Sequence, residues 1–254
     1  MANRVQSSRA INHFPVSRVL QRFARAAVCG FALIACASSM AQVPPSAAEA
    51  ARYTGLHAAA HKGDAAQVAK LAAGGANVNA RDPYGRTPLH VATFARQGEA
   101  IRALAKAGAD LGLLENDRYD AVTIAAVADD EKTLRILLSL GASAKLVTSR
   151  YDGTALIAAA HLGHDGVVKQ LIAAGAPLDH VNNLHWTAVI EAVVLGNGGP
   201  RHVETLRALV AAGANTRLTD RQGNTPLTLA KARGYREMAQ VLDAAPKTRE
   251  GKPN

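Results

Sequence analysis

The 254-residue chain predicts an all-α solenoid of six short repeats, because one pattern recurs from residue 54 to residue 245. The copies begin at spacings of 33, 33, 34, 33 and 38 residues, at Thr54, Thr87, Asp120, Thr154, Thr187 and Thr225. Every copy has Ala five positions after its start. Once five extra residues in the fifth copy are set aside, every copy also has Leu seventeen positions after its start. Such self-similarity is typical of units that bury their apolar faces only against their neighbours.

Each copy is expected to begin with a helix at its first residue. The hydroxyl of Thr87 can accept a hydrogen bond from the first helical turn, and Pro88 loses no hydrogen bond at the first helical position. Small residues such as Ala59 and Ala125 let neighbouring first helices approach closely. The third copy departs most from the pattern, with Asp120-Ala121-Val122-Thr123, so its capping is the least secure.

A second, more apolar helix follows in each copy. Its apolar stripe has i, i+3 spacing, as in Ile101 and Leu104 or Leu134 and Leu137. Glycine then ends the helix, because it adopts the left-handed conformation without a Cβ penalty. These glycines are Gly75, Gly108, Gly141, Gly175 and Gly213. Turns such as Asp82-Pro83-Tyr84-Gly85 are expected to project as fingers that lead to the next copy.

The array has distinct ends. Ser46-Ala47-Ala48-Glu49 is a capping-box pattern, so the first helix is expected to begin well before Thr54, within an N-terminal cap at 42–53. The six repeats are assigned to 54–86, 87–119, 120–153, 154–186, 187–224 and 225–245. A polar tail at 246–254 is expected to be disordered.

The string Thr87-Pro88-Leu89-His90-Val91-Ala92, on its 33-residue period, resembles the ankyrin repeat, and copy six keeps Thr225-Pro226-Leu227. The resemblance covers about three quarters of the chain. It implies helix-turn-helix units with β-turn fingers, and a protein that binds other proteins without catalysis or cofactor. It also implies that the rings of His57 and His90 hydrogen-bond the backbone between repeats, and that partners dock on the concave side formed by fingers and first helices.

Aromatic residues gather at the positions that this docking side would use. Six of the seven aromatic residues after residue 41 lie one or three positions before a repeat start or seven after it, and Tyr235 alone falls outside. Rigid rings are typical of binding hot spots. The alternative is that each ring packs along the neighbouring finger and stiffens it. We expect partner contacts from Tyr84, Arg86, Phe94, Asn116, Tyr119, Arg150, Tyr151, Asn183, Trp186 and Arg221.

Residues 1–41 are interpreted as a secretory signal peptide. Five Arg and no acid precede the apolar run 26–37, and Ser39-Met40-Ala41 offers a small-x-small cleavage site before Gln42. An uncleaved anchor or an organelle transit peptide are the alternatives. Leu33-Ile34-Ala35-Cys36 resembles a bacterial lipobox, so the membrane is an expected partner only if Cys36 is lipidated. We expect a periplasmic protein, with an outer-membrane lipoprotein or a secreted protein as alternatives.

Charge and motifs exclude several other classes. The net charge of +9 falls to +4 without residues 1–41, since 24 basic residues then face 20 acidic ones. These charges are interspersed, which argues against nucleic acid as a partner. No metal site is expected, because the nine histidines have no ligand spacing. No nucleophile motif or P-loop is present either, and Asp129-Asp130-Glu131 is interpreted as a solvated helix N-terminus. We expect a monomer.

Copy five carries an insertion between its two helices, Asn197-Gly198-Gly199-Pro200-Arg201. We expect a mobile turn there, with a basic tip at Arg201 and His202. It is either a second contact point or a tolerated insertion, and the second is favoured because surface loops accept extra length at little cost.

Overall fold

The computed structural model describes residues 42–246, and within that range it contains thirteen helices and no β-strand. The predicted signal peptide, with Cys36, and residues 247–254 of the predicted tail lie outside the described residues. Helix α1 is short (Ala47–Ala50). The others form six pairs: α2 (Gly55–Lys62) with α3 (Ala65–Ala73), α4 (Pro88–Phe94) with α5 (Gly98–Lys106), α6 (Ala121–Val127) with α7 (Glu131–Ser139), α8 (Ala155–Leu162) with α9 (Asp165–Ala173), α10 (Ala188–Val194) with α11 (Pro200–Ala211), and α12 (Pro226–Ala232) with α13 (Arg236–Asp243).

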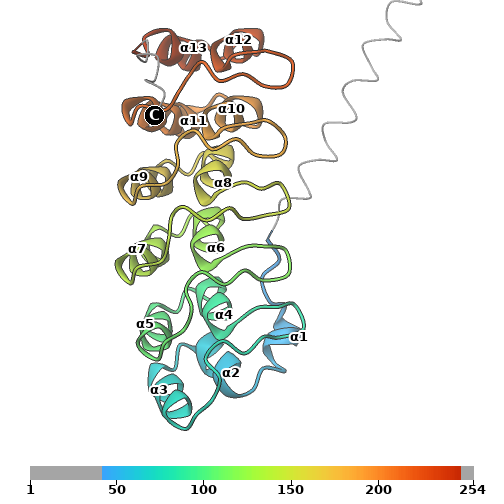
Figure 1. Ribbon diagram of the computed structural model, residues 1–254, viewed down its shortest axis with the longest axis vertical. Coiled ribbons are helices and arrows are strands. Elements are labelled where there is room, and N and C mark those ends of the chain that lie inside the picture. The colour runs from blue at the N-terminus through green and yellow to red at the C-terminus, as the bar shows by residue number, and fades with distance from the viewer. Residues whose placement is uncertain (1–41, 247–254) are drawn as a thin grey trace, which may run out of the picture. The chain divides into compact units, whose positions relative to one another are not determined.

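The pairs stack in chain order and form two columns of helices (Figure 1). The first column holds the first helices, α2, α4, α6, α8, α10 and α12, and the second holds their partners from α3 to α13. Each helix packs against the equivalent helix of the next repeat and against its own partner. The segments that connect one pair to the next all project on the side of the first column and form the fingers. This architecture confirms the predicted six-repeat solenoid.

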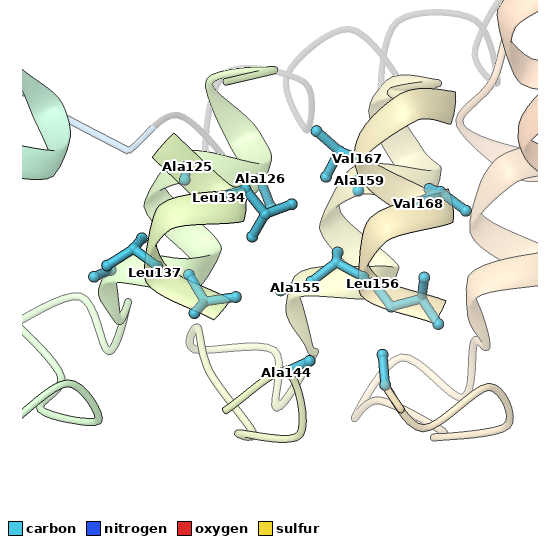
Figure 2. Packing of buried hydrophobic residues seen from close by; sticks show 14 of the residues in the cluster. Ala125, Ala126, Leu134, Leu137, Ala144, Ala155, Leu156, Ala159, Val167 and Val168 are labelled. Atoms are coloured by element: carbon cyan, nitrogen blue, oxygen red, sulfur yellow. The ribbon is translucent and has the colours of Figure 1, made fainter. Parts of the chain in front are cut away.

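The core lies between the columns and follows the predicted leucine positions. Leu104, Leu137, Leu171 and Leu209 are fully buried, whereas Leu71, in the first repeat, is only half-buried because no repeat precedes it in the stack. Figure 2 shows how Leu134 and Leu137 of α7 and Val167 and Val168 of α9 fill the space around small residues such as Ala125, Ala126, Ala155 and Ala159. Alanine on the first helices thus lets adjacent repeats approach closely.

Side-chain caps begin five of the six first helices, as predicted. The hydroxyls of Thr87, Thr154, Thr187 and Thr225 accept from the backbone N–H three residues later, and so does the Asp120 carboxylate in the divergent third copy. Thr54 makes no such bond, and the next residue, Gly55, has a left-handed φ of 54°. The predicted cap is therefore wrong at Thr54 only.

Glycine ends the second helices, again as predicted. Gly75, Gly108, Gly141, Gly175 and Gly213 have φ of 84°, 87°, 92°, 77° and 93°, in the left-handed region that favours glycine. The capping box at Ser46 is also confirmed, since the Ser46 hydroxyl accepts from Glu49 N and the Glu49 carboxylate accepts from Ser46 N. It starts the separate helix α1 rather than an extended first helix, because the chain turns between Ala51 and Thr54.

Arg201 in the insertion is not a free basic tip, which corrects the expectation for this segment. Pro200 begins α11, so Arg201 lies in the first helical turn. Its Nη2 lies 2.8 Å from Asp129 Oδ2, in the third repeat, and its Nε lies 3.4 Å from Asp165 Oδ1, in the fourth. One side chain thereby joins three successive repeats at the edge opposite the fingers.

His202, also expected at the tip, is buried, and its Nε2 lies 2.9 Å from the carbonyl oxygen of His161. Tyr235 supports the insertion from the other side, and its hydroxyl donates to the carbonyl oxygen of Gly196 at 3.0 Å. This packing gives a structural place to the one aromatic residue that lies outside the repeating positions.

The longest helix of the described part, α11, has 12 residues, and no helix of residues 42–246 is both long and apolar enough to cross a membrane.

Candidate functional site

Four of the five fingers within residues 42–246 are closed by a polar side chain that accepts from two backbone amides further along the turn. In the third finger the Ser149 hydroxyl accepts from the backbone N–H of Tyr151 at 3.2 Å. Asp82 Oδ1 accepts from the backbone N–H of Tyr84 and of Arg86, both at 2.9 Å. Asn182 closes the fourth finger and Asp220 the fifth in the same manner. These local bonds add to the backbone bonds across the same turns, such as the one from Asp82 N to the carbonyl oxygen of Arg86 at 3.0 Å. The finger tips are therefore rigid supports for the side chains between these residues.

The four polar residues predicted at the finger tips connect the fingers to one another. Asn116 and Asn183 donate from their side-chain amides to carbonyl oxygens of the preceding finger, at 3.3 and 3.0 Å. Arg150 pairs with Asp117 at 3.1 Å, and Arg221 donates to the carbonyl oxygen of Asn183. All four side chains lie at the surface. We call Asn116, Arg150, Asn183 and Arg221 the tip ladder, because each reaches back by one repeat.

Two predicted contact residues are buried, so neither presents the exposed side chain that partner binding would use. Arg86 is 3% exposed and its guanidinium lies between Asp82, at 2.8 Å, and Glu49, at 3.0 Å. Tyr119 is 9% exposed, and burial raises the pKa of its hydroxyl. The burial of the Tyr119 ring is what the alternative role of stiffening a finger requires, and the ion pairs of Arg86 join the first finger to the N-terminal cap.

The remaining predicted residues keep apolar area open to solvent. Tyr84 is 51% exposed, and Phe94, Tyr151 and Trp186 are half-buried. Phe94 is the last residue of α4, and the last residues of α6, α8 and α10 are also apolar. We call the last residues of these four helices, together with Leu195 directly after α10, the apolar row. Its members are Phe94, Val127, Leu162, Val194 and Leu195. Because the first helices are neighbours in the stack, the row crosses repeats two to five.

Four members of the apolar row, Val127, Leu162, Val194 and Leu195, are absent from the predicted contact residues, because that prediction rested on aromatic rings and polar side chains. Leu162 and Leu195 are 40% and 36% exposed, at the eighth position after the repeat start. The sequence carries a signal for these two residues, because a large aliphatic residue stands where other copies have Lys62, Ala95 or Ala128.

A buried acid also lies beneath this face and was not anticipated. Glu191 of α10 is 1% exposed, and its carboxylate accepts from the side-chain amide of Asn182 at 2.9 Å. His161 Nδ1, on α8, lies 3.2 Å from its other oxygen. The equivalent residues of the other copies are apolar, as in Val91 and Ile124. An isolated acid in an apolar column was the available signal, and its bonds fix the fourth finger against α8 and α10.

Most histidine rings of the described residues contact a backbone carbonyl oxygen. The Nε2 atoms of His57 and His90 lie 3.0 Å from the carbonyl oxygens of Arg86 and Leu113, in the segments that lead to the next repeat, which confirms the role implied by the resemblance. His180 makes the same kind of contact with Asp152. Nowhere in residues 42–246 do three or more His, Cys, Asp or Glu side chains converge as a metal site would require.

A pocket of about 380 Å³ opens where the N-terminal cap meets the first finger. Its walls include the rings of Tyr53 and Tyr84, and the Arg86 guanidinium lies 4.3 Å from the centre of the Tyr84 ring. Hydrogen bonds from Ser46 are the main cause that lowers the pKa of Glu49, to about 2, so this wall carboxylate is ionised at neutral pH.

Comparison with known proteins agrees with this architecture. Models of ankyrin repeats (3 copies) match residues 32–114, 56–148 and 122–216, and a model of ankyrin repeats (many copies) matches residues 200–242. The ankyrin repeat protein YahD of Escherichia coli (strain K12) is 36% identical over 188 residues, which cover 74% of this chain and 93% of YahD.

Solved structures give the same result. An ankyrin repeat domain from Acinetobacter baumannii AYE superimposes with a TM-score of 0.71 at 43% identity, covering 75% of this chain and 96% of that one. The ankyrin repeat domain of Bcl-3, a member of the IkappaB protein family, gives a TM-score of 0.68 at 27% identity, covering 77% and 87%. Ankyrin repeat domains are generally protein-interaction modules without enzymatic activity. The chain belongs to the ankyrin repeat family.

Proposed function

We propose that the protein is an exported, monomeric interaction module of the bacterial cell envelope, which captures a partner protein on the face formed by its fingers and first helices. The observation that carries this proposal is the apolar row at the C-terminal ends of α4, α6, α8 and α10, together with Tyr151 and Trp186 on the fingers that lead into α8 and α10. Exposed apolar area costs free energy in water, and a partner that covers it recovers that cost.

The tip ladder supports the same proposal indirectly. Because its side chains bond between successive fingers, the fingers hold one arrangement before a partner arrives. A preorganised surface loses less conformational entropy on binding than a flexible one. The aromatic rings on such a surface can then act as anchors, because large aromatic side chains commonly provide much of the binding energy of interfaces.

Export is proposed from residues 1–41, where basic residues precede a short apolar run and a small-x-small site. Cell fractionation of the native host, with N-terminal sequencing, tests it. Recovery from the periplasm of a chain that begins at Gln42 supports the proposal. A lipidated chain that begins at Cys36 would indicate an outer-membrane lipoprotein. Recovery in the culture medium of the bacterium, or inside cells of a eukaryote that it infects, would favour a host-directed effector that uses the same face.

Binding is tested by capture of the partner from an envelope extract with wild type, Trp186→Ala and Ile172→Ala. Ile172 is a matched control, because it is also half-buried but lies on α9 in the second column. We expect Trp186→Ala to lose the captured partner and Ile172→Ala to retain it, although both variants lose packing. Equal capture by the three proteins, with Trp186→Ala merely less stable, would show that the ring is structural and would overturn the proposed face.

A further inference from the structure

The pocket at the first finger combines aromatic walls with an unequal set of charges. Besides Tyr53 and Tyr84, it is lined by three arginines, Arg52, Arg81 and Arg86, but by only two carboxylates, which belong to Glu49 and Asp82. Its chemistry depends on which of these groups still have hydrogen-bonding capacity.

Both carboxylates are fully occupied by groups of the chain itself. Glu49 accepts from Arg86 at 3.0 Å with one oxygen and from the backbone N–H of Ser46 at 2.7 Å with the other. Asp82 accepts from the Tyr53 hydroxyl and from Arg86 Nε, both at 2.8 Å, with Oδ2, and its Oδ1 accepts the two finger amides. The acids of the pocket therefore both pair with Arg86, and neither has an oxygen left without a partner.

The other two arginines are exposed and have no acidic partner in the part of the chain that the structure describes. Arg52 uses only Nε, which donates to the carbonyl oxygen of Ala48 at 3.1 Å. Arg81 uses only Nη1, which donates to the carbonyl oxygens of Gly85 and Leu114 at 2.9 and 2.8 Å. No carboxylate lies within 4.0 Å of either guanidinium among residues 42–246. Since a guanidinium carries five N–H donors, the pocket has unused donors and a positive charge that is not neutralised.

We propose that this pocket takes the carboxylate of an Asp or Glu side chain of the partner protein, with Arg52 and Arg81 as its donors. This inference rests on the proposed protein-binding function and names the chemistry that the partner presents at the first finger. The aliphatic part of the acid lies against the exposed ring of Tyr84. Charge-assisted bonds from two guanidinium groups give such a contact both strength and orientation.

The inference is tested by titration of the full chain with three capped tetrapeptides, Gly-Phe-X-Gly, in which X is Glu, Gln or phosphoserine. Binding is followed by NMR, through the Nε–Hε signals of Arg52 and Arg81. We expect the Glu peptide to shift both signals and to bind about fivefold more tightly than the Gln peptide in low salt. The difference should shrink as NaCl is added, because salt screens exposed charges.

Variants separate the pocket from general attraction to a basic surface. Arg52→Gln should weaken the Glu peptide about fivefold, since it removes one of two charged donors. Arg135→Gln should leave affinity unchanged, because Arg135 is also exposed but lies on α7, in the second column. Arg81→Lys, which keeps the charge but removes the forked donor, should give an intermediate loss.

Three results would overturn the inference: equal affinity for the Glu and Gln peptides, tighter binding of the phosphoserine peptide, or an equal loss in Arg135→Gln. The wild-type NMR titration decides the first two even if a variant fails to fold. Failure here is distinguishable from failure of the proposed function, because Trp186 does not line this pocket. If capture of the partner depends on Trp186 but the pocket binds the Glu and Gln peptides equally, the proposed binding face is retained and only the carboxylate site is rejected.

Discussion

The side-chain amide of Asn183 donates to the backbone carbonyl oxygen of Arg150 at 3.0 Å, from the tip of one finger to the tip of the finger before it. The two residues stand 33 positions apart, one repeat, and Asn183 N also donates to the carbonyl oxygen of Tyr151 at 2.9 Å. Asn116 bonds to the finger containing Pro83 and Tyr84 through the same pair of groups. Two consecutive fingers are thus joined by a side-chain bond that runs parallel to a backbone bond.

Removal of one member of the tip ladder should cost stability. We expect Asn183→Ala to lower the free energy of unfolding by about 1 kcal/mol, the net worth of one such hydrogen bond. Urea denaturation at pH 7 measures it. Gln222→Ala is the control, because Gln222 is also an exposed amide at a finger tip but its side chain makes no hydrogen bond within residues 42–246. Equal stability of the two variants would show that the ladder does not stabilise the stack.

The repeat architecture could be predicted from sequence because its determinants are local and occur six times. A cap such as Thr154, an apolar pair such as Leu134 and Leu137, and a terminating glycine each act within one helix. The prediction from local patterns failed only at the N-terminal end of the array. Thr54 and Leu71 lack a preceding repeat, so their environments differ from those of the equivalent residues.

The candidate face was harder to predict, because exposure at a finger depends on the next finger. Tyr119 and Trp186 occupy equivalent positions, yet Tyr119 is buried and Trp186 only half-buried. The contact between Arg201 and Asp129 spans 72 residues and passes over one whole repeat, so no local pattern announces it. The position of a residue in the repeat therefore predicts its place on the finger. The side chains around it determine how much of it is exposed to a partner.

The insertion in the fifth repeat should be sensitive to one added methyl group. Gly198 has φ of 71°, and a Cβ there would lie 2.5 Å from the Tyr235 ring. Gly213 also has a left-handed φ, of 93°, but a Cβ there would meet nothing within 4 Å. We expect Gly198→Ala to destabilise the protein by about 1–3 kcal/mol more than Gly213→Ala, because only the first adds overpacking to backbone strain.

Thermal or urea denaturation of both glycine variants, with Gly198→Ala/Tyr235→Ala as a third, checks this explanation. Removal of the ring should recover part of the loss if the clash is its cause. A loss in Gly198→Ala that matches Gly213→Ala would mean that the insertion moves freely, as the sequence alone suggested.

Asp120 should be a weak point of the third repeat at neutral pH. It is 1% exposed, its Oδ1 caps α6, and its Oδ2 is buried without a hydrogen-bond partner. Burial raises the pKa of this carboxyl above its ordinary value of 3.8, so the folded state disfavours the ionised form. The resulting penalty on folding is present at pH 7, shrinks as the pH falls through the raised value, and is absent below about pH 3.8.

Asp120→Thr, which restores the residue of the other five copies, should therefore stabilise the protein by about 1 kcal/mol at pH 7. The gain should disappear toward pH 3.5. Free energies of unfolding at several pH values measure it. A stabilisation that does not depend on pH would show that the gain comes from better packing and not from the buried charge.

His90 should make the stack sensitive to acid. Its Nδ1 accepts from the backbone N–H of Thr87 at 3.0 Å, so Nε2 carries the proton and donates to the carbonyl oxygen of Leu113 at 3.0 Å. Burial lowers the pKa of this histidine from 6.5 to about 4. Between these values the unfolded chain binds a proton that the folded chain does not, so stability is lost as the pH falls from 6.5 to 4.

The full shift corresponds to a loss of about 3 kcal/mol over this range. His90→Gln keeps a side-chain amide that can donate to Leu113 but cannot titrate, so its stability should fall less steeply than that of wild type. Because carboxylates titrate in both proteins, the difference between the two curves isolates His90. Parallel curves between pH 7 and pH 4 would mean that His90 titrates alike in the folded and unfolded chains, contrary to its burial between two backbone partners.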